Sequence, residues 1–411
     1  MATAIRSSTA LLLIMLSGGV ACGEDRSAEV GEAHPTWMTE DEYRFRDSDE
    51  EELFFTAPEV RADPARGRIF AVDRPNHQVS ALALDGTLLF RVGGRGEGPG
   101  EFTNIGSLHI EPDGAFAVQE AERGRYARFT AHGELAGTTP GPPAALSYQG
   151  LPVDIHWPRD SSYLGTPRIP NELEVGWGGL APVTRIPVVR LRSLGNRQWS
   201  DLEPLLWVDI SNRVHYIVLP GDGEGDTTFV TGSQPFGDPD QMTFEPGAVV
   251  VLRSKGKPGT AEIIEVEVGG DTIWHRRVEL GVPRRLTSEM VAEAAETWVD
   301  GVLSTSSRYT PARLRESYYD GLHQPEYMPP SEGPPLLTAS GEVWVRTPEL
   351  LDTLRVYYAV PRGDRTGVPR RVLVPASLWV TDATETHVWG TRWDSLGQPH
   401  IVGRRLVPPS T

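Results

Sequence analysis

The 411-residue sequence contains few groups of side chains in a pattern typical of a catalytic or metal site, and its ten histidines show this first. No two of the ten histidines are spaced like a pair of metal ligands on one helix or strand. A catalytic site could still collect single side chains from distant segments, and His109, His156, His215 and Asp154 are the candidates for it. A turn or surface position is the favoured interpretation of each. The sequence therefore predicts no catalytic residue, no metal site and no cofactor.

Two short motifs resemble part of a calcium loop and part of a serine-nucleophile elbow, and each lacks residues that such a site requires. The run 222–226 (DGEGD) places carboxylates at the first, third and fifth positions of a calcium loop. Such loops carry glycine at position six and glutamate at position twelve, and here position twelve is Ser233. Gln234 and Pro235 follow Ser233, so the Gly-x-Ser-x-Gly elbow of a serine nucleophile is absent. An acidic turn is the favoured interpretation of 222–226.

Cys22 is the only cysteine, and it ends a short leader. Arg6 is the only charge before residue 24, and an apolar run extends from Ala10 to Leu16. A positive start, a short apolar core and small residues before the cut predict a signal peptide over residues 1–21. The end at Cys22 resembles a bacterial lipobox, in which this cysteine becomes lipid-modified, although Gly19 stands where leucine is usual. Ordinary cleavage after residue 21 is the alternative, and lipidation of Cys22 is favoured because a polar tract follows this solitary cysteine.

Composition and charge exclude several classes of protein. The chain is 39% hydrophobic with 43 glycines and 35 prolines, which does not fit a helical bundle or a polytopic membrane protein. A net charge of -17 argues against a nucleic-acid partner, since phosphates require a Lys/Arg surface. One cysteine cannot form an intramolecular disulfide, a thiolate zinc site or an iron–sulfur cluster.

Much of this charge lies in residues 22–52, for which the sequence predicts an acidic tether. Twelve acidic and three basic residues occur between Gly23 and Glu52. The first part, to about Pro35, lacks apolar periodicity and is expected to be an extended spacer. Its charge would be repelled by anionic lipids and would hold the body away from the membrane. Aromatic residues at 37, 43, 45, 54 and 55 indicate that the later part returns to the folded body as a strand.

Residues 53–411 repeat a short β pattern. Gly67 and Gly114 are 47 residues apart, as are Gly86 and Gly133, and each pair holds the same place in a strand–turn–strand–turn–strand unit. Such a period is typical of a propeller blade. Weaker copies lie near 245–274, 340–360 and 378–403, while the pattern is degraded over 150–235. The fold class expected is all-β: a β-propeller of four-stranded antiparallel blades, with room for six.

One segment breaks the β pattern and predicts a helical insertion at about 287–322. Apolar residues from Met290 to Val302 recur at three- and four-residue spacing, and a second helix is expected to begin at Thr310-Pro311. The stripe that includes Trp298 is expected to pack on its own domain, and contact with a partner is the alternative.

The run 92–102 (VGGRGEGPGEF) resembles the connection between blades in NHL-like six-bladed propellers of secreted and lipid-anchored bacterial proteins. Residues 72–79 (VDRPNHQV) and 388–397 (VWGTRWDSLG) are similar to two further elements of that group. The resemblance covers about 66–137 and 336–407, and it implies a fold and a compartment but no activity. It leaves the blade count open between six and seven. A phosphate cradle is the disfavoured alternative for the glycine-rich run, because the phosphate-loop spacings are missing.

Two functions are expected from these features. The favoured one is a non-catalytic binding or scaffold module in the cell envelope, anchored to the membrane by its N-terminal lipid and holding a protein or glycan partner. Gly23, rather than aspartate, follows the cysteine, which favours the outer membrane. The alternative is a propeller enzyme of the lactonase or lyase type with a metal in its central channel, which rests on analogy between folds alone.

Overall fold

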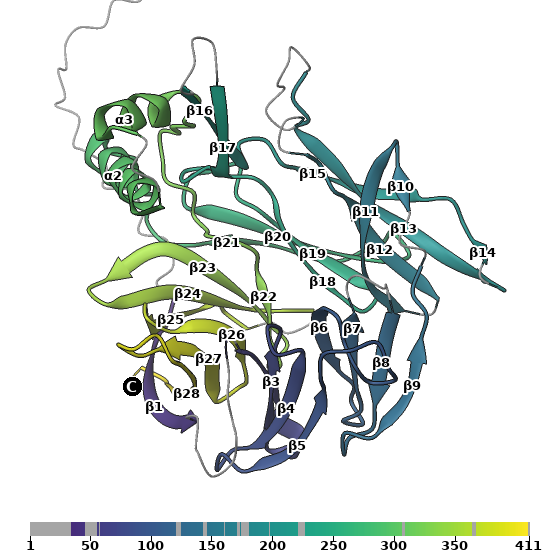
Figure 1. Cartoon of the computed structure of the whole chain (residues 1–411). Coiled ribbons are helices and arrows are strands. Elements are labelled where there is room, and N and C mark those ends of the chain that lie inside the picture. The colour runs from purple at the N-terminus through teal and green to yellow at the C-terminus, as the bar shows by residue number, and fades with distance from the viewer. Residues whose placement is uncertain are drawn as a thin grey trace, which may run out of the picture. The chain divides into compact units, whose positions relative to one another are not determined.

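The computed structural model describes residues 34–45, 56, 58–120, 125–142, 146–159, 161–170, 173, 181–196, 198–220, 227–305, 309–363 and 367–409. The expected signal peptide 1–21, the lipidation site Cys22 and the acidic turn 222–226 lie outside these residues. Strands dominate the described chain, and their sheets are set around a common centre in a propeller-like arrangement (Figure 1).

Four sheets are regular blades, each a meander of four consecutive antiparallel strands. The first holds β2 (Pro58–Asp63), β3 (Arg68–Asp73), β4 (Gln78–Ala83) and β5 (Leu88–Gly93), with a short 3-10 turn, η1 (Pro64–Arg66), before β3. The second holds β6 (Ile105–Ile110), β7 (Phe116–Glu120), β8 (Arg125–Phe129) and β9 (Leu135–Thr139). The third holds β18 (Gln241–Glu245), β19 (Ala248–Arg253), β20 (Thr260–Glu267) and β21 (Thr272–Glu279). The fourth holds β22 (Leu336–Leu337), β23 (Glu342–Leu351), β24 (Leu354–Pro361) and β25 (Arg370–Pro375).

The repeated glycines of the first two blades occupy equivalent turns. Gly86 and Gly133 have φ of 94° and 85°, a conformation that favours glycine over residues with a Cβ. A Cβ on Gly86 would lie 3.1 Å from the ring of Phe45, and one on Gly133 would lie 2.5 Å from the ring of Phe90. Glycine at this position of the repeat therefore allows the turn. It also leaves room for an aromatic ring, that of Phe45 beside Gly86 and that of Phe90 beside Gly133.

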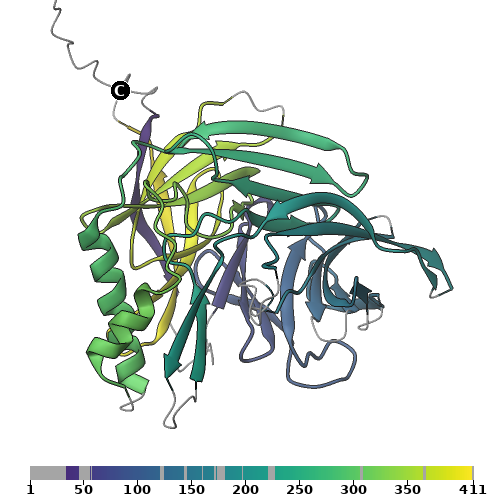
Figure 2. The same cartoon turned by 90° about the horizontal axis from the view of Figure 1, so that it is seen from above.

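The degraded region between the second and third blades forms irregular sheets. A six-stranded sheet contains β10 (Ser147–Tyr148), β11 (Leu151–Arg159), β12 (Ser162–Pro167), β13 (Arg185–Gly195), β14 (Gln198–Trp199) and β15 (Glu203–Asp209). A separate two-stranded ribbon follows, with β16 (Val214–Pro220) antiparallel to β17 (Thr227–Ser233). The helices α2 (Ser288–Thr305) and α3 (Pro311–Tyr319) lie in the segment expected to hold a helical insertion, and they flank this ribbon (Figures 1 and 2).

The two ends of the described chain meet in the remaining sheet. It contains β26 (Trp379–Ala383), β27 (His387–Trp393), β28 (Pro399–Val407) and the N-terminal strand β1 (Thr36–Phe45). Strand β1 runs antiparallel to β28 from Met38↔Val407 to Phe45↔Ile401. It also begins parallel to β25, with Thr36 opposite Arg371, so that β22–β28 and β1 form one eight-stranded sheet.

Apolar clusters lie between sheets that follow one another in the chain, and one further cluster lies between the last sheet and the first blade. They join β3–β4 to β6–β8, β7–β8 to β12–β13, β12–β15 to β19–β20, and β19–β21 to β23–β25. Two further clusters join β23–β25 to β26–β28, and β27–β28 with β1 to β2–β4. Phe102, from the glycine-rich run that resembles a blade connection, is fully buried in the cluster between the first two blades.

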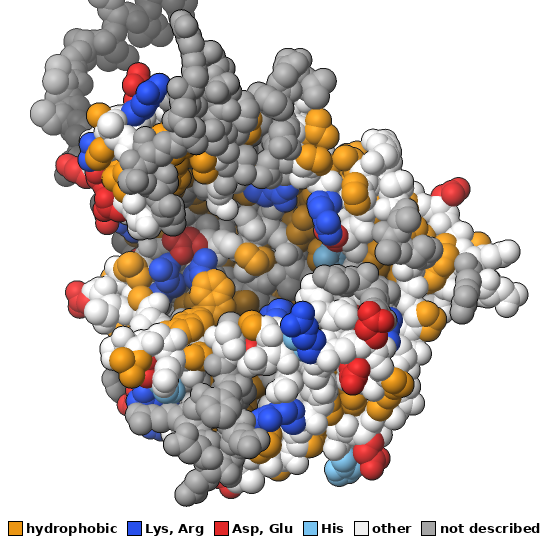
Figure 3. Space-filling model, viewed as in Figure 1, with side chains coloured by type: hydrophobic (Ala, Val, Ile, Leu, Met, Phe, Trp, Pro, Cys, Tyr) orange, Lys and Arg blue, Asp and Glu red, His pale blue; other side chains and the backbone are white. Residues whose placement is uncertain are grey.

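Figure 3 shows Lys and Arg side chains around a hollow in the middle of one face.

The expected count of six four-stranded blades is wrong, since the described residues form four regular blades. The physical reason lies in two places: 150–235 lacks the alternating pattern that a regular meander needs, and β1 merges the last strands with the fourth blade. The boundary expected at 52/53 is also too late, because β1 belongs to the folded body, as the aromatic residues at 37, 43 and 45 indicate.

The acidic residues of β1 have basic partners rather than only solvent. Arg404 binds the carboxylate of Asp41 and donates to the hydroxyl and the carbonyl oxygen of Thr39, at 3.0 and 2.7 Å. Arg405 binds Glu40 at 2.5 Å and Glu42 at 3.3 Å. Charge complementarity between β1 and β28 therefore accompanies their backbone pairing, and this part of the predicted tether is a structural strand.

Candidate binding groove between helix α2 and strands β16 and β17

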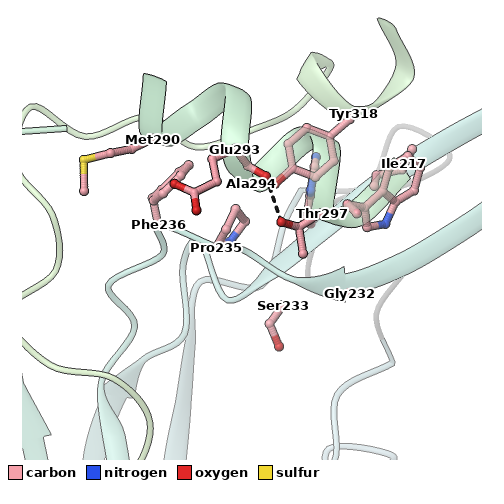
Figure 4. A pocket seen from close by; sticks show the side chains of 12 residues that line it. Ile217, Gly232, Ser233, Pro235, Phe236, Met290, Glu293, Ala294, Thr297 and Tyr318 are labelled. Atoms are coloured by element: carbon pink, nitrogen blue, oxygen red, sulfur yellow. Dashed lines mark hydrogen bonds between the residues drawn. The ribbon is translucent and has the colours of Figure 1, made fainter. Parts of the chain in front are cut away.

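A cavity of about 530 Å³ opens between α2, the β16–β17 ribbon and the segment that follows β17. We call it the α2 groove; its lining consists of His215, Ile217, Gly232, Ser233, Pro235, Phe236, Met290, Glu293, Ala294, Thr297, Trp298 and Tyr318. Figure 4 shows Met290, Glu293, Phe236 and Pro235 toward one end and Thr297, Tyr318 and Ile217 toward the other. The volume falls within the range of sites that hold a small ligand or a few side chains.

Local sequence sets the position of α2. The Thr287 hydroxyl accepts a hydrogen bond from the Met290 N–H at 3.3 Å, which satisfies one of the free donors at the helix start. The side of the helix formed by Ala295 and Val299 is buried against Ile217 and Leu219 of β16 and against α3. The apolar stripe is wider than this contact, so Met290, Ala294 and Trp298 continue it into the α2 groove. Packing of the stripe on its own domain is therefore confirmed for Ala295 and Val299, and contact with a partner stays a prediction.

Helix α3 supplies the aromatic end of the groove. It begins at Pro311 after Thr310, as the sequence predicts, and Thr310 makes no side-chain capping hydrogen bond. Its Tyr318 ring lies 5.3 Å from the ring of Trp298 and 4.9 Å, edge-on, from the ring of His215, measured between centroids. Burial raises the pKa of Tyr318. The tyrosine therefore stays neutral and contributes an apolar face with one hydroxyl.

The polar groups of the groove differ in their surroundings. His215 is 2% exposed, and its Nε2 faces the carbonyl oxygen of Asp320 at 3.4 Å. Burial lowers the pKa of His215, so its ring is neutral at pH 7. Thr297 donates to the carbonyl oxygen of Glu293 at 2.9 Å, as Figure 4 shows. The Glu293 carboxylate has no hydrogen bond or ion pair with any residue that the structure describes, and its side chain is exposed.

The four residues weighed as a catalytic set do not meet in one site. His215 lines the α2 groove, His109 lies in β6, and His156 and Asp154 lie in β11. Asp154 accepts a hydrogen bond at 3.2 Å from Arg168, the residue that follows β12. All four residues lie in strands rather than turns; the side chain of Asp154 is at the surface, as the alternative of a surface position predicts, whereas His215 is buried. Over the ranges that the structure describes, no three His, Cys, Asp or Glu side chains are placed to hold a metal ion together.

His156 is packed as a core residue. Its ring stacks on that of Phe244 in β18, with centroids 3.6 Å apart and an interplanar angle of 8°. Its Nε2 is buried without a hydrogen-bond partner among the described residues. Burial lowers the pKa of His156 from 6.5 to about 4, with Asp154 opposing the shift.

This lowered pKa predicts an acid-sensitive fold. Because the unfolded chain binds the proton more tightly, the contribution of His156 to stability is complete above pH 6.5 and is lost as the pH falls toward 4. We expect the free energy of unfolding to lose about 2–3 kcal/mol from this group between pH 7.5 and 4.5. Urea unfolding at both pH values, with His156→Phe beside wild type, measures it: the variant should lose this part of the pH dependence. The exposed His132→Gln should keep it, and an unchanged slope in His156→Phe would contradict the assignment.

An ion cluster that sequence reasoning missed joins the third and fourth blades. Arg362, which follows β24, donates to Glu265 of β20 at 2.6 Å and to Glu245 of β18 at 2.9 Å. Burial opposes the charge on Arg362, but the hydrogen bonds that it donates to Glu265 and Glu245 outweigh burial and raise the pKa of the guanidinium. Because both carboxylates are occupied by this arginine, the cluster joins two blades and is not an open site.

The α2 groove itself was also missed from the sequence. Its walls come from segments near residues 215–236 and 290–318, and spacing along the chain does not reveal that they meet. The only local signal is the apolar stripe of α2, which is wider than one packing contact requires. No helix in the described part of the chain is long and apolar enough to cross a membrane.

Comparison with known proteins gives no family. No protein-family model matches the sequence, and no curated protein matches it. Several solved structures are similar to this chain in fold. One is a member of the DUF4221 family from Bacteroides vulgatus, which is 8% identical; the alignment covers 92% of this chain and 99% of that chain, with a TM-score of 0.45. Virginiamycin B lyase from Staphylococcus aureus has 11% identity, 86% and 95% coverage and a TM-score of 0.35. A gluconolactonase from Xanthomonas campestris has 13% identity, 92% and 100% coverage and a TM-score of 0.34. Identities this low carry no activity over to this chain.

Proposed function

We propose that this protein is a non-catalytic binding module of the cell envelope, anchored by a lipid on Cys22, that holds a protein partner in the α2 groove. The observation that carries the proposal is the groove itself. Its lining is mostly apolar and aromatic and belongs to a helix pair and a ribbon that stand outside the regular blades. The propeller-like body then acts as a rigid support for this attachment.

The chemistry of the lining favours a protein over a glycan. Phe236, Trp298 and Tyr318 offer ring surface, while the free hydrogen-bonding groups are few. Sugars need several hydrogen bonds to replace those lost to water, whereas an apolar side chain needs only the removal of its surface from water. Aromatic and Met side chains are also enriched in the buried centres of protein interfaces.

The proposed anchor fits the position of β1. Thirteen residues, 23–35, separate Cys22 from the first residue of β1. Fully extended, they span at most about 45 Å, at roughly 3.3–3.6 Å for each residue. The acidic tether would thus hold the body off the lipid surface but within about 45 Å of the anchor, and we propose the outer membrane as its place.

Mutation of the cysteine tests the anchor. We expect Cys22→Ser to move the protein from the membrane fraction to the soluble extracytoplasmic fraction, because the acylated residue is lost. Fractionation with immunoblotting, and mass spectrometry of the wild-type N-terminal peptide, measure this. Ser17→Ala, in the leader, should remain membrane-bound. A Cys22→Ser protein that is still processed and membrane-bound would show that the lipid proposal is wrong.

Site-specific cross-linking tests the groove. With a photo-reactive residue at Met290 of the full-length protein in its native membranes, we expect one discrete cross-linked protein, reduced about tenfold by Trp298→Ala. A buried aromatic anchor of an interface is worth about 1–2 kcal/mol or more, which corresponds to such a loss. Ala294→Gln, which fills the groove and keeps the aromatic rings, should have the same effect.

The matched control is Trp393→Ala, because Trp393 is 45% exposed and lies in β27, outside the groove. It should leave the cross-link intact. Circular dichroism establishes that each variant is folded. Equal cross-linking in wild type, Trp298→Ala and Ala294→Gln would overturn the proposed function.

A further inference from the structure

We infer that the partner of the α2 groove presents a Lys or Arg side chain beside a large apolar side chain, so that the cation meets Glu293 and the apolar group meets the ring of Trp298. This inference rests on the proposed function and adds the chemistry of the partner. It concerns one occupant, a basic amphipathic segment of another protein.

The first support is an uncompensated charge in an apolar site. Of the described side chains that line the groove, Glu293 alone carries a full charge at neutral pH, since Lys and Arg are absent and burial lowers the pKa of His215. Apolar walls lower the local dielectric when a ligand excludes water, and the attraction of a carboxylate for a cation then increases. A basic group is the complement that this lining lacks.

The second support is the charge pattern of α2. Four acidic residues and no basic residue occur in its 18 residues, at positions that recur on one side of the helix: Glu289, Glu293, Glu296 and Asp300. Glu296 is paired with Arg315 of α3 at 2.5 and 2.6 Å, so that charge is already compensated. Glu289 and Glu293 have no ion pair within the described part of the chain. Figure 3 shows acidic side chains gathered over α2.

The third support is the aromatic wall. The rings of Trp298 and Tyr318 lie 5.3 Å apart and face the groove beside Thr297. A guanidinium or ammonium over the face of a tryptophan is attracted by the ring quadrupole, in addition to the carboxylate. The whole chain carries a net charge of -17, so a basic partner is also attracted at longer range.

Binding of defined peptides to the protein lacking residues 1–21 tests the inference. Three amphipathic peptides of equal length share their leucines and carry lysine, serine or glutamate at the polar positions. We expect isothermal titration calorimetry to give the lysine peptide an affinity at least about tenfold above the serine peptide, with the glutamate peptide weakest. Glu293→Gln should reduce the affinity for the lysine peptide about threefold to tenfold and leave the serine peptide unchanged. Added salt should reduce the preference for lysine.

The control variant is Asp271→Asn, which removes the same charge at the exposed turn between β20 and β21. It should change neither affinity by more than a small factor. Equal affinity for the lysine and serine peptides, or equal losses in Glu293→Gln and Asp271→Asn, overturns the inference. If Trp298→Ala still weakens all three peptides, the groove is a binding site and only the charge preference is wrong. If Trp298→Ala changes none of them, the proposed function fails as well.

Discussion

A chain that begins at residue 46, and so lacks β1, should fail to reach the native fold. Strand β1 pairs with β28 from Met38 to Phe45, and without it the facing edges of β25 and β28 lose their backbone partners. Phe45 is 6% exposed, and its ring is parallel to that of Trp389 with centroids 6.3 Å apart. Burial of such a side chain contributes about 1.5–3 kcal/mol, and the lost pairing adds to it. Both losses reduce a stability that is only about 5–15 kcal/mol for a typical domain.

The comparison protein begins at residue 34 and keeps β1 intact. We expect it to be soluble and to unfold in one cooperative transition, while the chain from residue 46 is aggregated or shows no transition by circular dichroism. A synthetic peptide of residues 34–45, added during refolding of the shorter chain, should restore the transition, because β1 is held by pairing and side-chain contacts alone. Two proteins with melting temperatures within a few degrees of each other would show that β1 does not close the fold.

The substitution Asp382→Ala should cause a large loss in the free energy of unfolding. Asp382 is 3% exposed and accepts backbone hydrogen bonds from three segments: Ala62 at 2.8 Å, Ala339 at 2.9 Å and Ala383 at 2.7 Å. One carboxylate therefore joins β2, the turn before β23 and β26. Removal leaves three N–H groups without this acceptor, and those of Ala62 and Ala383 are buried, at about 1–3 kcal/mol each. We expect a loss of about 4 kcal/mol in the free energy of unfolding, measured by urea denaturation.

Asp382→Asn separates the loss of acceptors from the loss of charge. Its amide oxygen can still accept from Ala339 and Ala383, while its NH₂ group would face the N–H of Ala62. We expect an intermediate loss of about 2 kcal/mol. Asp113→Asn is the matched control, because Asp113 accepts only from Ala115 in an exposed turn, at 3.0 Å, and it should change stability by less than about 0.5 kcal/mol. A loss in Asp382→Ala no larger than in Asp113→Asn would contradict the role of Asp382.

Patterns among residues that are close in the sequence predicted several helices and strands correctly. The 47-residue repeat of glycines corresponds to β3–β5 and β7–β9, and the apolar spacing from Met290 onward corresponds to α2. The start of α3 after Thr310 follows from the proline at the first helical position. These features depend on turn geometry and on periodicity, and both are set by residues adjacent in the chain.

The errors share a physical cause. The blade count failed because a regular meander was assumed across 150–235, where the alternating pattern is weak and the chain forms the β10–β15 sheet and a separate ribbon. The sequence predicts the histidines in turns or at the surface, because an isolated polar residue has no pattern around it that indicates burial. His156 is instead covered by Phe244, which is 88 residues away and lies in another sheet.

Patterns among neighbouring residues are sufficient to predict the local parts of this protein: the β repeat, the glycine turns, the helical insertion and an acidic segment with aromatic residues that join the body. Contacts between distant parts of the chain become visible only in the three-dimensional fold. It paired β1 with β28, brought Asp382 to three backbone donors, and set α2 against the β16–β17 ribbon so that Glu293 and Trp298 share one groove. The reason is that hydrogen-bond partners and apolar contacts across the fold depend on how the sheets close around their centre. The spacing of residues along the chain does not predict these contacts.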